Sequence, residues 1–316
     1  MYSSVVRDGA YKSRLCEFIR QEYRLAPAQI TPAKRGFYGE TWRLDTENGP
    51  YFLKLDYSTA HKGVYERSFP AIEHLRRHGI DFVSKIVKTC QGALCTRFDG
   101  AVLGLFDWID GENIETDDTK GPEYQMLAKV YTVPTEGLDL RREDFSAQSA
   151  ARFYQQWDGL KRMPPRDEAT RILTLFEENR ANLERWSGRL DHFSGLCQGD
   201  LTPFFITHGD AGGNLIVGKD GYFIVDWDDP VLAPPERDGW FMYGQDWAAD
   251  TFHRALRQNG IPYTLRPERL LYYIYHYIFF YLTELLDGFL EAHTANEIEG
   301  YFKGWVMERV RAAETV

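Results

Sequence analysis

Apolar residues recur along the chain with two spacings, and these predict where helices and strands lie. Leu15, Phe18, Ile19 and Tyr23 follow the three-and-four-residue spacing of a helix with one apolar face. The same period in the C-terminal third, from Leu270 to Phe289, predicts a long aromatic helix that packs into the core. Helices are predicted over about 10–24, 62–78, 123–131, 146–160, 167–185 and 270–289.

Short apolar runs bounded by glycine, asparagine or aspartate predict strands. Glu47-Asn-Gly49 and Asp99-Gly100 are turn sequences of the kind that join antiparallel strands in hairpins. The first half of the chain therefore carries a small antiparallel sheet and the second half is mostly helical, which is an α+β pattern. Strands are predicted over 34–45, 50–56, 84–89, 92–97, 101–106, 215–217 and 222–225.

The last two predicted strands form a hairpin that carries the candidate chemistry. Gly218-Lys-Asp-Gly221 reads as the turn between them. Asp210 and Asn214 lie on the loop that enters the first strand, and Asp226 ends the second. Strand pairing is expected to bring Asn214 and Asp226 close together.

Two carboxylates and an amide in this arrangement suit phosphoryl transfer. One carboxylate orients the attacking hydroxyl and accepts its proton, while an amide and a second carboxylate supply oxygen ligands for Mg²⁺. Asp210 is the candidate base, and Asn214 and Asp226 are the candidate metal ligands. The alternative is an ordinary loop rich in aspartate and asparagine, in which His208 is structural.

The stretches Thr207-His-Gly-Asp-Ala-Gly-Gly-Asn214 and Phe223-Ile-Val-Asp-Trp-Asp228 resemble the catalytic and metal-binding motifs of the aminoglycoside phosphotransferase family, relatives of the protein kinases. The resemblance implies a bilobal kinase-like fold and ATP or GTP as co-substrate. Residues 1–106 would form the N-terminal lobe, 107–112 a hinge, and 113–316 the C-terminal lobe.

The catalytic loop departs from the family pattern. Ala211, Gly212 and Gly213 separate Asp210 from Asn214, one residue fewer than the usual spacing. Two glycines allow the backbone a tighter path. His208 is expected to support the loop, because no Gly-x-Ser-x-Gly nucleophile turn is present to give it a role in a hydrolase.

Lys54 is the candidate that binds the nucleotide phosphates. It stands in an apolar strand, where a lysine either points to solvent or needs a partner. In the related kinases a glutamate from the next helix orients this lysine. Glu66 is favoured for its place in the first turn, and Glu73 is the alternative.

Other nucleotide contacts follow from the resemblance. Gly36 and Gly39 stand where a flexible loop covers the phosphates, although two glycines at a strand start often mark only a turn. Phe106-Asp-Trp-Ile-Asp-Gly-Glu112 resembles the family's hinge, so the Asp107 carbonyl and the Ile109 amide would contact the base.

The region after the hairpin supplies further candidates. In the family an aspartate here braces the catalytic loop, and Asp238 matches it, with a helix N-cap as the competing interpretation. Family members also bind the amines of aminocyclitols through acidic residues of this subdomain, and a solvated helix face is the alternative. The weak candidates are Asp246, Asp250, Glu284 and Asp287.

Composition narrows the class of protein. With 316 residues and an ordinary apolar fraction, the chain can form one large domain or two lobes. The net charge of −10 argues against general affinity for nucleic acid or anionic membrane. The four cysteines lack metal-ligand spacing and are expected to be reduced. With neither a signal region nor a run long enough to span a bilayer, the protein is expected to be cytoplasmic.

These observations favour a nucleotide-dependent O-phosphotransferase that acts on a small molecule, and the negative net charge is compatible with a cationic one. Neither a P-loop nor a Gly-x-Gly-x-x-Gly fingerprint is present. Phe69-Pro-Ala-Ile-Glu-His-Leu75 and Asp226-Trp-Asp-Asp-Pro230 look most like the spectinomycin kinase branch, which implies an aminocyclitol acceptor. The alternatives are a kinase of choline, homoserine, a sugar or a macrolide, and a non-catalytic nucleotide-binding pseudokinase, which the shortened loop favours.

Overall fold

The chain forms two compact units in a computed structural model that describes residues 7–33, 39–58, 63–199, 203–287 and 294–315. The first unit comprises residues 1–141 with 206–232, and the second comprises 142–205 with 233–316. The predicted hinge, 107–112, lies within the first unit. The lobe boundary placed there from the sequence stays a prediction.

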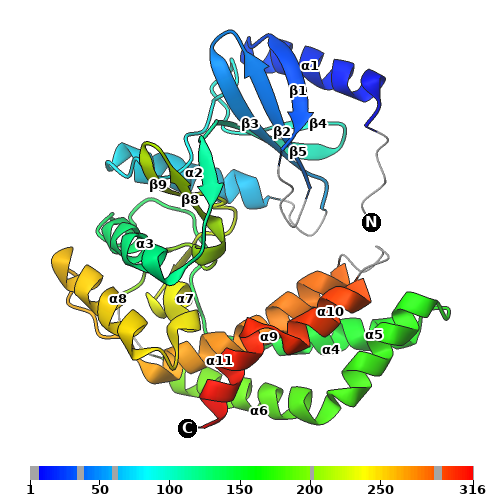
Figure 1. The fold of residues 1–316 in the computed structure, drawn as a ribbon, viewed down its shortest axis with the longest axis vertical. Helices are drawn as coiled ribbons and strands as arrows, with labels where there is room; N and C mark the ends of the chain where they lie inside the picture. The colour runs from blue at the N-terminus through cyan, green and yellow to red at the C-terminus, as the bar shows by residue number, and fades with distance from the viewer. Residues whose placement is uncertain (1–6, 34–38, 59–62, 200–202, 288–293, 316) are drawn as a thin grey trace. The chain divides into compact units, whose positions relative to one another are not determined.

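A five-stranded antiparallel sheet with the order β1-β2-β3-β5-β4 dominates the start of the first unit (Figure 1). Helix α1 packs its apolar face on this sheet, with Leu15 and Ile19 fully buried among residues such as Leu44 and Leu53. The elements are α1 (Gly9–Tyr23), β1 (Pro27–Pro32), β2 (Glu40–Thr46), β3 (Gly49–Asp56), α2 (Val64–Arg77), β4 (Thr96–Phe98) and β5 (Ala101–Asp107).

The rest of the first unit contains the predicted hairpin. β8 (Leu215–Gly218) pairs with β9 (Gly221–Ile224), and β6 (Gly111–Asn113) adds a third strand beside β8. β7 pairs with β10 in a separate two-stranded sheet. The remaining elements are α3 (Asp117–Val130), β7 (Phe205–Thr207), the 3₁₀ turn η1 (Gly212–Asn214) and β10 (Val231–Ala233).

The second unit is helical, as predicted, and its core is built around α9 (Pro267–Asp287). Aromatic rings from several helices, including Phe153, Trp157 and Phe176, fill this core together with the buried face of α9. The other elements are α4 (Gln148–Lys161), α5 (Asp167–Glu178), α6 (Arg180–Cys197), α7 (Glu236–Gly239), η2 (Trp240–Met242), α8 (Asp246–Gln258), α10 (Thr294–Lys303) and α11 (Trp305–Glu314).

Three predicted elements need correction. Residues 84–89 do not form a regular strand: Ile86 makes one bridge to Phe106, because β4 already pairs with the other end of β5. Of the residues predicted as a strand over 92–97, only Thr96 and Arg97 belong to a regular strand, where they begin β4. The helix predicted over 167–185 ends at Asn179, whose side-chain amide donates to the Leu175 carbonyl (2.8 Å) and so competes with the helical pattern.

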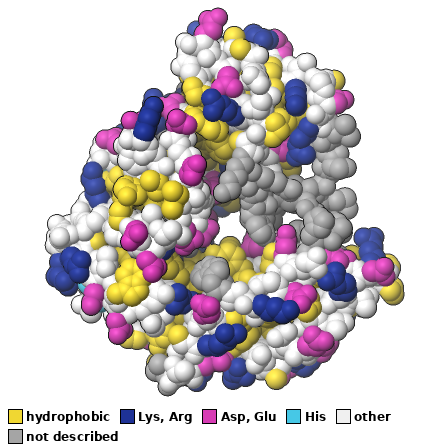
Figure 2. All heavy atoms as spheres, viewed as in Figure 1, with side chains coloured by type: hydrophobic (Ala, Val, Ile, Leu, Met, Phe, Trp, Pro, Cys, Tyr) yellow, Lys and Arg dark blue, Asp and Glu magenta, His cyan; other side chains and the backbone are white. Residues whose placement is uncertain are grey.

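The charges on the surface and the state of the cysteines agree with what the composition predicts. The face drawn in Figure 2 carries Lys and Arg side chains interspersed with Asp and Glu. The four cysteines are free thiols. Within the described ranges, every helix is too short or too polar to cross a bilayer.

A buried carboxylate in the second unit supports a prediction about stability. Glu236 is fully buried and accepts hydrogen bonds from the Tyr263 hydroxyl (2.9 Å) and the Arg266 amide (2.6 Å). Glu236→Ala would leave both donors without their acceptor, so we expect the free energy of unfolding to fall by about 3 kcal/mol. Urea denaturation measures this, with Glu178→Ala on the exposed face of α5 as the control. A loss no larger than in the control would contradict the prediction.

Candidate active site

The hairpin of β8 and β9 brings the two candidate motifs together. Leu215 pairs with Ile224 and Gly218 with Gly221, so the turn is Lys219-Asp220 as predicted. Beyond the last pair, the Val225 amide donates to the Asn214 carbonyl (3.0 Å). Asn214 and the segment that begins with Asp226 are therefore adjacent, because the strand register places them at the same end of the hairpin.

His208 links these two segments. Its Nδ1 accepts from the Asp210 amide (3.1 Å), so its proton is on Nε2, which donates to the Val225 carbonyl (2.8 Å). The ring also packs edge-on against Trp227, with centroids 4.7 Å apart. The imidazole thus holds the loop before β8 against the segment after β9.

The shortened loop closes as a 3₁₀ turn over Gly212–Asn214. The Asn214 side-chain amide donates to the carbonyl oxygen (2.8 Å) and the carboxylate (3.2 Å) of Asp210. One face of the turn is crowded, because a Cβ on Gly212 would lie 2.7 Å from Lys120 Nζ and 2.9 Å from Glu115 Oε1. Glycine at 212 therefore allows the tight path.

Lys120 and its partners were not predicted from the sequence. The Lys120 amine is buried and pairs with Glu115 and Glu123, both at 3.0 Å. The three residues lie in and before α3, far from the loop in sequence, and the spacing of lysine and glutamate at 120 and 123 is a common one on helices. The contact with Gly212 shows that they support the loop that contains Asp210.

Asp210 lies at the surface of the first unit, and its pKa differs from that of an ordinary aspartate. Its side chain is exposed, so a hydroxyl can reach it. The surrounding protein nevertheless disfavours the charged form, and this desolvation raises the pKa of Asp210, with Asp226 and Glu115 acting in the same direction and His208 against it. A carboxylate with a raised pKa is a better proton acceptor in general-base chemistry.

Lys54 is held between two carboxylates from the segment after β9. Its side chain is only 9 % exposed, and its amine forms ion pairs with both Asp226 and Asp228. Burial lowers the pKa of Lys54, but the two carboxylates outweigh it and keep the pKa well above its ordinary value. The lysine is therefore a permanent cation at this site.

The two carboxylates differ in acidity although water reaches both, with 38 % of the Asp226 side chain and 31 % of the Asp228 side chain exposed. Burial raises the pKa of Asp226, but Lys54 more than offsets it, so the pKa is below its ordinary value. Burial and the neighbouring Asp226 charge raise the pKa of Asp228 to about 7. Asp228 was not among the predicted site residues.

The predicted pairing of Lys54 with Glu66 is wrong. The Glu66 carboxylate accepts from Arg97 (3.0 Å) at the protein surface. Glu73, the alternative, pairs with Lys88 (2.6 Å). Arg97 and Lys88 lie on segments next to α2 and draw both glutamates away from Lys54.

The predicted hinge follows the end of β5. Asp107 is the last residue of that strand, with its carboxylate 3.1 Å from the Lys85 amine, and Ile109 lies between β5 and β6. Both line a cavity of about 490 Å³ that also includes Trp108 and Phe223. This cavity includes neither Lys54 nor Asp226, so it does not identify the base-binding site.

Gly39 precedes β2 in a conformation that requires glycine. Its φ is +75°, and a Cβ there would lie 2.0 Å from the Leu55 carbonyl oxygen. Gly36 lies outside the described residues.

The candidates beyond the hairpin lie in the second unit. Asp238 is buried within α7 and does not cap a helix, because α7 begins two residues earlier. Asp246 and Asp250 are exposed on α8. On α9, Asp287 is paired with Arg152 (2.9 Å), whereas Glu284 is only 8 % exposed. Burial and then the nearby Asp287 raise the pKa of Glu284 to about 7.

Solved structures of small-molecule kinases share this fold. Spectinomycin phosphotransferase APH(9)-Ia, solved with ADP and spectinomycin, is 20 % identical over 95 % of this chain and 98 % of its own, with a TM-score of 0.74. The amicoumacin kinase hAmiN, solved with AMP-PNP, Ca²⁺ and Ami, is 16 % identical over 98 % and 96 %, with a TM-score of 0.60. Choline kinase from Cryptosporidium parvum Iowa II is 9 % identical over 96 % of each chain, with a TM-score of 0.58. The predicted kinase-like fold is confirmed.

A search of curated protein sequences gives no match. The model of the phosphotransferase enzyme family, APH, matches residues 29–271, a range that contains Lys54, the catalytic loop and the hairpin. The chain therefore belongs to the phosphotransferase enzyme family.

Proposed function

We propose that this phosphotransferase transfers the terminal phosphate of ATP or GTP to a hydroxyl of an aminocyclitol such as spectinomycin. The observation that carries the proposal is the meeting of Asp210, Asn214 and Asp226 at one end of the β8–β9 hairpin, with Lys54 paired to Asp226. The acceptor class is supported by the sequence segments that resemble spectinomycin kinases and by the similarity of fold to APH(9)-Ia.

Each residue of this cluster has a separate role in the proposed reaction. Lys54 binds the nucleotide phosphates, and Asp210 orients the acceptor hydroxyl and takes its proton. Asn214 occupies one carboxylate oxygen of Asp210, so the other oxygen is the one that faces the hydroxyl. The hinge backbone at Asp107 and Ile109 contacts the base, and Gly39, with Gly36, belongs to the loop over the phosphates. Asp238 stays a candidate brace for the catalytic loop.

The donor set fits Mg²⁺. Asp226 provides a carboxylate, and Asn214 directs its NH₂ group to Asp210, which leaves Oδ1 as its donor to a cation. No group of three or more His, Cys, Asp or Glu side chains that could hold a metal occurs in the described part of the chain. Mg²⁺ usually binds through few protein ligands, and nucleotide phosphates and water complete its coordination. The ion would neutralise charge on the transferred phosphoryl group.

Glu284 is the strongest candidate for binding an acceptor amine. It is the most buried of the four acidic candidates, whereas Asp287 already has a cationic partner. A cationic amine placed against Glu284 would favour the carboxylate form. Because burial raises the pKa of Glu284 to about 7, the carboxylate form that can bind an amine accumulates only as the pH rises through this value.

Two consequences follow for a Glu284→Gln variant. We expect KM for a cationic acceptor to rise by about tenfold or more, with little change in kcat, because the amine loses a charge-assisted partner. In the unaltered enzyme, KM should fall as the pH rises through about 7, and in the variant it should not. Steady-state kinetics between pH 6 and pH 8 give both results, and Asp191→Asn, at an exposed position on α6, is the control. Equal effects of the two substitutions would argue against Glu284.

An acceptor panel tests the proposed function directly. Consumption of ATP and of GTP is measured with spectinomycin, aminoglycosides, choline, homoserine and sugars, and the product is identified by its added phosphate mass. We expect turnover with an aminocyclitol. Turnover only with choline, homoserine or a sugar would replace the acceptor, and nucleotide binding without turnover on any acceptor would favour a pseudokinase.

A further inference from the structure

Lys54 obtains its carboxylate partners from one short segment of the chain. Asp226 and Asp228 both pair with its amine. On helix α2, which follows the strand that contains Lys54, Glu66 pairs with Arg97 and Glu73 pairs with Lys88. The helix that supplies the orienting glutamate in protein kinases thus directs these two glutamates elsewhere.

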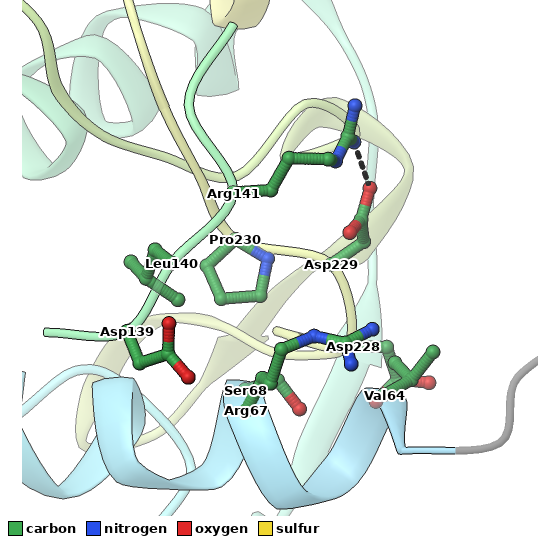
Figure 3. A pocket seen from close by; sticks show the side chains of 9 residues that line it. All are labelled: Val64, Arg67, Ser68, Asp139, Leu140, Arg141, Asp228, Asp229 and Pro230. Carbon is green, nitrogen blue, oxygen red and sulfur yellow. Dashed lines mark hydrogen bonds and ion pairs between the residues drawn. The ribbon is translucent and has the colours of Figure 1, made fainter.

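The face of α2 nearest Lys54 presents other groups. The Lys54 amine lies 5.9 Å from the centre of the Tyr65 ring. One turn further along α2, Ser68 is 1 % exposed, and within the described chain its hydroxyl has no hydrogen-bond partner. Ser68 and Asp228 line the same cavity of about 290 Å³, shown from close by in Figure 3. The Tyr65 ring therefore lies on the α2 side of Lys54, while Ser68 of the same helix lines a cavity with Asp228, which pairs with Lys54 from the segment after β9.

The backbone after β9 presents both carboxylates to one amine. Asp226 has a φ of +65°, which turns the chain sharply at the end of the strand. Trp227, between the two aspartates, is buried against His208 and donates from its indole nitrogen to the Ile224 carbonyl (2.9 Å). With Trp227 anchored in this way, the side chains on either side of it both reach Lys54.

The two carboxylates cannot have the same role if Asp226 holds a cation. A carboxylate that coordinates a metal attracts an amine less strongly. If Asp226 binds the metal, Lys54 therefore needs a second carboxylate that remains paired with it. We propose that Asp228 is the positioning residue for Lys54 and replaces the helix glutamate of protein kinases. The catalytic role of this contact rests on the proposed function, but the contact between Asp228 and the Lys54 amine can be tested without any reaction.

The test compares Asp228→Asn with the double variant Asp228→Asn/Ser68→Glu, in which α2 regains a carboxylate beside the same cavity. Metal-free and nucleotide-free protein is treated with trinitrobenzenesulfonate, and the labelling rate of Lys54 is followed by peptide mass spectrometry. Asp228→Asn should label Lys54 about tenfold faster, since one charge-assisted partner is lost. The double variant should return to within about threefold of the original rate. Thermal unfolding of each variant shows that the protein is folded.

Kinetics supply the second readout. Asp228→Asn should lower kcat by about 10²-fold with a smaller change in the KM for nucleotide, because a misplaced lysine affects the transferred group more than nucleotide binding. The double variant should recover most of kcat. Asp229→Asn, one residue away and paired with Arg141 at the surface, should change neither readout.

The outcomes separate this inference from the proposed function. Unchanged Lys54 labelling in folded Asp228→Asn overturns the inference, whatever the acceptor is. Faster labelling in Asp228→Asn that the double variant reverses supports it, even if the enzyme proves to act on a different acceptor. A third outcome also counts against the inference: Lys54 is labelled faster in Asp228→Asn, and adding Ser68→Glu does not slow the labelling, although the double variant unfolds like the original protein. In that case α2 does not face Lys54 as described.

Discussion

Asp210→Asn is expected to reduce kcat by at least about 10²-fold, because general-base catalysis contributes about 10²–10⁴-fold. Asparagine keeps the size of the side chain but cannot accept the proton of the acceptor hydroxyl. The backbone amide of residue 210 still donates to His208, so the loop should keep its path. Dissociation constants for nucleotide should change by no more than about twofold, because the role proposed for Asp210 concerns the acceptor and not the nucleotide. Single-turnover phosphoryl transfer and nucleotide titration measure the two quantities.

The raised pKa of Asp210 adds a pH dependence to this prediction. Only the carboxylate can take the proton, and desolvation by the surrounding protein raises the pKa of Asp210, so the carboxylate forms at a higher pH than in an ordinary aspartate. The original enzyme should therefore lose kcat as the pH falls, and the residual activity of Asp210→Asn should lack this acid limb. Asp118→Asn, an exposed aspartate in the first turn of α3, serves as the control. Turnover of Asp210→Asn close to that of the control would remove Asp210 from the base role.

The parts of the site that are local in sequence could be predicted. The hairpin follows from two apolar runs and a glycine-bounded turn, and its register alone sets Asn214 next to the segment of Asp226. Asp210 precedes the first strand by a few residues, so its place required no long-range information. Helices α1, α2, α4 and α9 likewise follow from periodic apolar residues within one segment.

The partners of Lys54 could not be predicted in this way. Lys54 and its two carboxylates are separated by 172 and 174 residues, and nothing in either segment specifies the other. The expected partner, Glu66, was chosen from its position in α2, but exposed cations on the neighbouring segments compete for surface glutamates. The support of Gly212 by Lys120 and Glu115 is also a tertiary contact with no local pattern.

Strand β1 was missed for a different reason. Pro27-Ala-Gln-Ile-Thr-Pro32 begins and ends with proline, which cannot donate to a neighbouring strand and usually argues against one. β1 is one of the two edge strands of its sheet and has an irregularity between Pro27 and Gln29, so only one side needs to pair. The proline rule holds for central strands, and the sequence alone does not say which strand is at the edge.

Asp226→Asn tests the metal side of the site with little disturbance of the backbone. Residue 226 has a positive φ, which asparagine tolerates about as well as aspartate, so the substitution changes charge and leaves the turn intact. If Asp226 and Asn214 hold Mg²⁺ as proposed, the nucleotide affinity of the original enzyme should increase strongly with Mg²⁺, because the ion would neutralise charge on the phosphates. In the variant we expect this Mg²⁺-dependent gain to fall by about tenfold or more. Calorimetric titration with and without Mg²⁺ measures the gain.

The same variant separates the two carboxylates that share Lys54. Asp228 keeps its ion pair with the lysine when residue 226 is neutral, so metal-free nucleotide affinity should stay within about threefold of the original. Asp229→Asn lies in the same segment, and its surface pair with Arg141 contributes little, so it is the control for non-specific effects of lost charge. A Mg²⁺ titration of Asp226→Asn that matches that of Asp229→Asn would exclude Asp226 as a metal ligand. A loss of metal-free binding as large as the loss of metal-dependent binding would instead show that Asp226, and not Asp228, keeps Lys54 in place for the phosphates.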